Sequence, residues 1–175
     1  MPDYDQSNSE CFVLTFKEGL LSKIAHDLKI SVTRFRVSID PTGPSVVARF
    51  DPGSLVVTAV MSQGAEDANG LSAADKDKIA EQIAGDVLHA SRHPQIEFRS
   101  SSVSPLPGGG YDIRGALSLH GVTREVTTVT RLQGERQVVD LELHQPDFGI
   151  TPFKAMMGTL KVKPHVRIQL SVPKA

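Results

Sequence analysis

The sequence is poor in several residue types that would narrow its class. Its 175 residues include no tryptophan, two tyrosines and a single cysteine, Cys11. One cysteine excludes an intrachain disulfide and leaves the redox compartment undecided. The formal net charge of -1 lacks the basic excess that binds nucleic acid or anionic membranes, so we expect no nucleic-acid partner. No apolar run approaches the roughly 20 residues of a membrane-spanning helix.

The first ten residues, MPDYDQSNSE, contain neither the basic nor the apolar segment of a secretory signal. As the sequence is written, we therefore expect a soluble protein located in the cytoplasm. A chain of this length is most simply one domain with a buried core. We expect that domain to cover residues 1–175, with a barrel at about 11–172 and a flexible N-terminus at 1–9.

Most of the chain alternates between apolar and polar residues with a period of two. The clearest case is LKVKPHVRIQLSV at 160–172, where the even positions are apolar or proline and the odd positions are polar. This pattern predicts a long strand with one buried and one solvated face. Pro164 in its middle predicts a sheet edge or a bulge. Similar segments occupy 11–16, 30–40, 45–50, 54–61, 95–103, 111–120, 124–132 and 137–144.

The segment from about residue 72 to 91 breaks this pattern and predicts a helix. Ser72 is a candidate N-cap, with Asp75 three residues further on. Ile79, Ile83 and Val87 recur every four residues and form an apolar stripe. Pro94 disfavours helical backbone in the residue before it. One helix within many alternating strands indicates a mainly all-β antiparallel sandwich or barrel.

Three motifs, AGDVLHASRHPQIEFRSSSV, YDIRGALSLHGVTREV and DFGI, resemble the YceI-like family over about residues 11–172. The resemblance implies a lipocalin-like antiparallel β-barrel of about eight strands, with the helix packed over one end. It also implies an elongated apolar interior that binds a polyisoprenoid or isoprenoid quinone. Homodimers and periplasmic members are common in the family. The chain departs from the commoner pattern in SKIAHDL at 22–28 and at His144, where arginine is frequent.

Alternation alone does not distinguish a solid core from a ligand tunnel, because both need apolar inward faces. An interior with few aromatic residues suits a flexible hydrocarbon chain better than a planar ligand. We expect no catalytic residue and no metal site, and the bound cofactor, if any, to be a polyisoprenoid or quinone. The predicted apolar lining is Phe12, Leu14, Phe16, Phe35, Val37, Phe98, Leu117, Leu119, Phe148, Phe153, Met156, Val166 and Ile168.

Two polar pairs, His26-Asp27 and His144 with Asp147, are candidates for the rim of the barrel. If both lie at one mouth, they could orient a quinone head group, bind a metal or support acid-base chemistry. The alternative is a hydrogen-bonded network that joins two loops. Three functions therefore stay open: a lipid carrier, an enzyme that uses these four residues on a small apolar substrate, and an interaction module with a filled core.

The remaining histidines have simpler interpretations. His120-Gly121 predicts a tight reversal between two strands, with Gly121 free to take a positive φ. His89 and His93 lie four residues apart, a spacing that can bind metal on a helix, but histidines are also favoured near a helix C-terminus. Met156 and Met157 are interpreted as apolar cover, either as core or as a flexible lid.

Overall fold

A computed structural model describes residues 2–18, 27–155 and 160–175. Within these ranges thirteen antiparallel strands form one sheet. The strands are β1 (Asp3–Asp5), β2 (Glu10–Glu18), β3 (Asp27–Val32), β4 (Phe35–Asp40), β5 (Ser45–Phe50), β6 (Leu55–Ser62), β7 (Ala65–Asp67), β8 (Ile96–Pro105), β9 (Tyr111–Leu119), β10 (Val122–Gln133), β11 (Arg136–His144), β12 (Lys154–Ala155) and β13 (Leu160–Pro173).

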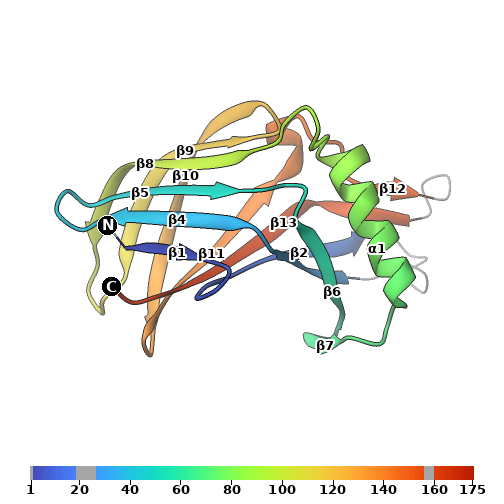
Figure 1. Ribbon diagram of the computed structural model, residues 1–175, viewed down its shortest axis with the longest axis horizontal. Coiled ribbons are helices and arrows are strands. Elements are labelled where there is room, and N and C mark those ends of the chain that lie inside the picture. The colour runs from blue at the N-terminus through green and yellow to red at the C-terminus, as the bar shows by residue number, and fades with distance from the viewer. Residues whose placement is uncertain (1, 19–26, 156–159) are drawn as a thin grey trace.

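The sheet curls into a half-barrel instead of closing (Figure 1). Its hydrogen-bonded order is β1-β4-β5-β8-β9-β10-β11-β13-β2-β3-β6-β7, and β12 pairs only with β13. No pairing within the described residues joins the end strands β1 and β7. The mainly all-β antiparallel class is confirmed, but the count of about eight strands is wrong. Short strands such as β1, β7 and β12 carry too few residues to show an alternation.

The predicted strand at 30–40 is in fact two strands. β3 ends at Val32 and β4 begins at Phe35, so the chain leaves one half of the sheet and enters the other. The break is held by Ser54, whose carbonyl accepts hydrogen bonds from the N–H and the hydroxyl of Thr33 at 3.0 and 2.7 Å. The buried positions change from even numbers in β3 (Leu28, Ile30 and Val32) to odd numbers in β4 (Phe35 and Val37), so one continuous alternation does not run through the segment.

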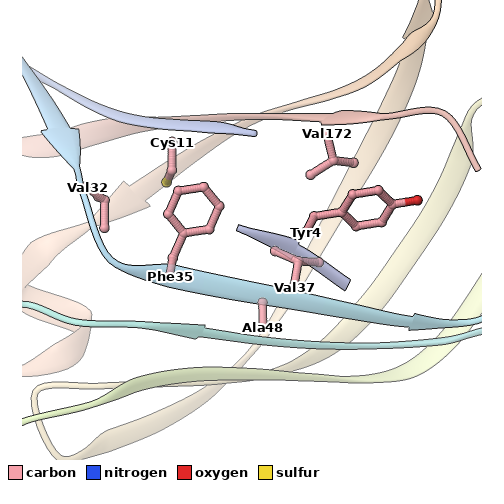
Figure 2. Packing of buried hydrophobic residues seen from close by; sticks show 7 residues of the cluster. All are labelled: Tyr4, Cys11, Val32, Phe35, Val37, Ala48 and Val172. Atoms are coloured by element: carbon pink, nitrogen blue, oxygen red, sulfur yellow. The ribbon is translucent and has the colours of Figure 1, made fainter. Parts of the chain in front are cut away.

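The N-terminus is also more ordered than the sequence predicted. Asp3–Asp5 form β1 and pair with β4, which corrects the expectation of a flexible segment at 1–9. Tyr4 is 6% exposed and packs against side chains from both halves of the sheet. Figure 2 shows it between Val37 of β4 and Val172 of β13. A single buried ring in a polar stretch thus fixes this strand.

One α-helix, α1 (Ala73–Gln82), continues into a π-helical turn (Ile83–Val87) in the described part of the chain. Its N-cap is Ser72, whose hydroxyl accepts a hydrogen bond from the Asp75 N–H at 3.1 Å, as predicted. Figure 1 shows α1 lying across one end of the curled sheet, far from both chain termini. Ile79 and Ile83 pack against the cluster formed by β3 and β6, and Val87 belongs to a second cluster with β9 and β11. The helix therefore bridges the two halves of the sheet.

Two further predictions from local sequence are confirmed. The reversal between β9 and β10 uses His120 and Gly121, with φ of 54° and 73°. The pairing of β13 with β2 shifts between Val162 and Val166, which places a bulge at Pro164. Proline has no N–H for the ladder, and this accounts for the bulge.

Gly115 permits the close approach of β8 and β9, and its replacement tests the packing of this corner. A Cβ at Gly115 would lie 2.3 Å from the carbonyl oxygen of Arg99 and 2.6 Å from the ring of Phe98. We expect Gly115→Ala to lower the free energy of unfolding by roughly 3 kcal/mol, because backbone must move. Urea denaturation measures this change.

Gly85 in the π-helical turn provides the matched control. A Cβ there meets nothing within 4 Å. Gly85→Ala should therefore leave stability unchanged or raise it by up to about 1 kcal/mol, because alanine loses less backbone entropy on folding. Equal unfolding midpoints for the two variants would contradict the close approach at Gly115.

Candidate functional site

A cavity of about 800 Å³ runs inside the curl of the sheet and under α1. Inward side chains of β13 contribute to its wall from Lys161 to Leu170. These residues span nine steps of a strand, or about 30 Å at 3.3 Å per residue. Almost all of the lining is aliphatic or phenylalanine, with few polar side chains. The cavity is thus long and apolar.

Four charged residues in the described part of the chain line the cavity, and one of them, Asp51 between β5 and β6, is paired with Arg34. Asp75 and Lys78 of α1 and Lys161 of β13 line the cavity and are exposed to solvent. Because an exposed lining residue touches both the cavity and the solvent, these three side chains mark its mouth. None of the residues of α1 itself is fully buried, since its apolar face meets a hollow space.

Most of the residues predicted to form the apolar lining lie in the cavity wall. The contact of these residues with a ligand stays a prediction. The residues placed there are Val37, Phe98, Leu117, Leu119, Phe148, Phe153, Val166 and Ile168.

The prediction for Phe12, Leu14 and Phe16 is wrong, because the opposite face of β2 lines the cavity. Cys11, Val13 and Thr15 lie in the wall, opposite Leu170, Ile168 and Val166 of β13. Directly opposed residues share a face of the sheet, and neighbours in a strand alternate. The three predicted side chains therefore point outward, where the Lys29 ammonium lies 4.1 Å from the centroid of the Phe12 ring. Both faces of β2 are apolar, so alternation could not choose between them.

Two other lining predictions have different outcomes. Phe35 is buried but lies outside the wall; its ring stacks on Phe50, which lines the cavity, at a centroid distance of 5.9 Å. Met156 lies outside the described residues, as does Met157.

Asp27, His144 and Asp147, the rim candidates within the described residues, do not converge on the cavity. His144 Nδ1 and Asp147 Oδ1 are 3.0 Å apart, and this hydrogen bond holds the pKa of Asp147 below its usual value. His144 also contacts His165, the residue opposite it on the paired strand β13, and the centroids of the two rings are 4.7 Å apart. Leu143 and Val166 face the cavity, so both adjacent histidines face outward.

Asp27 lies apart from this pair. Its Oδ1 accepts a hydrogen bond from the Lys17 N–H at 2.7 Å, at the start of β3. Strands β13 and β2 lie between β11 and β3, which separates Asp27 from His144 by roughly 14 Å at 4.8 Å per strand. Leu28 lines the cavity, so the Asp27 side chain faces outward. His26 lies outside the described residues.

The other three histidines meet each other instead. The His120 ring lies 4.8 Å from the His93 ring and 5.3 Å from the His89 ring. His120 Nδ1 is 3.1 Å from the Phe148 carbonyl, and Nε2 is buried without a partner among the described residues. Burial, and then the charge of His120, Arg92 and His89, lower the pKa of His93. In the described ranges no group of three or more His, Cys, Asp or Glu side chains is arranged to hold a metal ion.

Two buried polar residues of the cavity wall belong to no sequence motif that predicts a binding site. Thr15 and Gln145 line the cavity and are each 8% exposed. Gln145 Nε2 donates to the carbonyl of Lys163 in the β13 bulge at 3.1 Å. A single threonine or glutamine does not by itself indicate a site, so the position of both residues in the wall is visible only in the folded structure.

A second pocket of about 500 Å³ lies between β10 and β11. These strands pair only from Thr130 to Gln133 of β10 and then separate. Thr128 and Leu141 line both this pocket and the main cavity. Thr128 and Leu141 therefore lie between the two pockets where β10 and β11 part.

Comparison with known proteins adds the family. The sequence profile of the YceI-like domain matches residues 5–173. The chain belongs to the YceI-like family. BcnA of Burkholderia cenocepacia has a similar fold, with a TM-score of 0.67, 20% identity, and 98% of this chain and 99% of that chain covered.

Two further solved structures resemble this YceI-like chain. A polyisoprenoid binding domain from Saccharophagus degradans, implicated in plant cell wall breakdown, matches with a TM-score of 0.60, 12% identity, and coverage of 94% and 91%. The Campylobacter jejuni YCEI protein matches with a TM-score of 0.52, 10% identity and 79% coverage of both chains. No curated protein sequence matches. None of the helices in the described ranges is long and apolar enough to span a bilayer.

The reactivity of the Cys11 thiol measures how well the cavity wall of this YceI-like protein is buried. Burial raises the pKa of its thiol from 9.0 to about 12. Because the thiolate is the nucleophile, the folded protein should react with iodoacetamide at pH 8 roughly a thousandfold more slowly than the urea-unfolded chain. Timed labelling with mass detection measures both rates.

The same shift sets a pH dependence of stability. The unfolded thiol ionises near pH 9 and the folded one near 12, so this contribution is complete below pH 9 and is lost as the pH rises to about 12. Equal labelling rates in the folded and unfolded states at pH 8 would contradict the burial of Cys11 in the wall.

Proposed function

We propose that this protein is a non-catalytic binder of one long apolar lipid, of the isoprenoid or isoprenoid-quinone class. The observation that carries the proposal is the long, aliphatic cavity of about 800 Å³. Its size falls within the range of ligand pockets, and a solid core would leave no such space. The similar fold of the polyisoprenoid binding domain from Saccharophagus degradans supports the same class of ligand.

Burial of hydrocarbon supplies the affinity. Each methylene that leaves water contributes about 0.8 kcal/mol, so ten contribute about 8 kcal/mol. Association costs several kcal/mol in lost freedom, which leaves short chains weakly bound. Affinity should therefore rise with chain length until the tail fills the space from the mouth to Leu170.

The two other functions receive less support. An enzyme that uses His26, Asp27, His144 and Asp147 would need them to face the cavity, whereas β3 and β11 direct Asp27 and His144 outward and Asp147 is hydrogen-bonded to His144. His26 lies outside the described residues. An interaction module with a filled core is disfavoured by the hollow interior. A homodimer and a cytoplasmic location stay predictions.

The cavity is tested by filling it. Val126 of β10 faces the cavity, and Val126→Phe would place a ring in its space. We expect at least a tenfold loss of affinity for a prenyl lipid, equivalent to about 1.4 kcal/mol, with little loss of stability because the ring enters empty space. Native mass spectrometry of the purified protein, before and after organic extraction, measures the bound lipid.

Val129→Phe is the matched control on the same strand. Val129 points outward and is 47% exposed, so this variant should retain its lipid. The proposal fails if wild-type protein carries no lipid as purified and takes up no added prenyl lipid.

A further inference from the structure

Thr15 lines the cavity and carries a buried hydroxyl that pairs with no group in the described part of the chain. The residue is 8% exposed and lines the cavity beside Val13 and Cys11. Its Oγ1 is buried and has no hydrogen-bond partner among the described residues. Buried hydroxyls in native proteins are nearly always paired, and an unpaired one costs free energy. A ligand that supplies the missing partner would recover that cost.

The surroundings of Thr15 form a polar spot in the apolar wall. The β13 bulge lies against it, because β2 advances from Lys17 to Thr15 while β13 advances from Val162 to Val166. On the other side of the bulge, Gln145 lines the cavity and donates to the Lys163 carbonyl at 3.1 Å. Bulges often occur where a strand re-aims side chains beside a binding site.

This spot lies just inside the mouth. Lys161 marks the mouth on β13, and the bulge follows within a few residues of it. Beyond it, the wall along β13 is formed by Val166, Ile168 and Leu170. A lipid that enters tail first would thus leave its polar end beside Thr15.

The chemistry of the spot favours a neutral group. A threonine hydroxyl both donates and accepts, so it can pair with a carbonyl or a hydroxyl oxygen. The lining cations Lys78 and Lys161 are exposed at the mouth, so neither lies in the buried wall with Thr15. A charged group buried beside Thr15 would carry a large desolvation cost.

We propose that Thr15 is a specificity-determining residue, whose hydroxyl binds the neutral carbonyl or hydroxyl oxygen at the polar end of the lipid. This inference rests on the proposed lipid-binding function. Because Oγ1 is buried in the wall, the proposal requires a rotation about the Cα–Cβ bond to another staggered rotamer that turns the hydroxyl toward the lipid.

The test compares a C20 prenyl alcohol with the matching prenyl hydrocarbon, bound to delipidated full-length protein. The variant Thr15→Val removes only the hydroxyl and keeps the shape. We expect roughly a tenfold loss of affinity for the alcohol and none for the hydrocarbon. Thr15→Ser keeps the hydroxyl and should keep the preference. Thr127→Val, on the exposed outer face of β10, is the matched control for a threonine substitution in a strand.

Thermal unfolding of the empty proteins provides a second readout. Valine removes an unpaired buried hydroxyl, so the midpoint of Thr15→Val should equal or exceed that of wild type. Equal effects of Thr15→Val on the two probes, or no effect on either, would overturn the role of Thr15 and leave lipid binding intact. Failure of wild-type protein to bind either probe would overturn the proposed function itself.

Discussion

The half-barrel depends on direct contact between its two halves, and the end that carries the chain termini shows this contact most clearly. There Tyr4 of β1, Val37 of β4 and Ala48 of β5 pack against Cys11 of β2 and Val172 of β13 (Figure 2). Each apolar side chain buried at such a contact contributes roughly 1.5–3 kcal/mol. Toward the other end, Ile79 and Ile83 pack on β3 and β6, and Val87 packs on β9 and β11. The cavity lies inside the curl between these contacts and under α1.

The side chains that face the cavity differ in chemistry from those on the outer face of the sheet. Aliphatic side chains that line the cavity offer a hydrocarbon chain van der Waals contacts along its length. The titratable groups that first suggest a site, His144, Asp147 and Asp27, lie on the outer face, where they pair with each other or with backbone. Two buried polar residues of the wall, Thr15 and Gln145, carry no charge and flank the bulge of β13.

The parts of the fold that were predictable have strong local causes. The N-cap of α1, the His120-Gly121 reversal and the Pro164 bulge each follow from the chemistry of one or two residues. Predictions failed where the inward face of a strand depends on its pairing with a strand far away in the sequence. The inward face of β2 is decided by its register with β13, which pairs Val13 with Ile168. In β2 both faces are apolar, and a period of two is equally consistent with either.

Periodicity and composition act locally, so the amino-acid pattern alone predicts the all-β class, the helix near residues 72–91 and an interior of aliphatic side chains. The open sheet, the hollow interior and the polar groups that face it become visible in the assembled fold. These properties depend on how far the sheet curls and on how its strands register, and both are set by contacts between residues far apart in the chain, such as Tyr4 and Val172. A volume inside a fold is a property of its assembled walls, and no segment carries it alone.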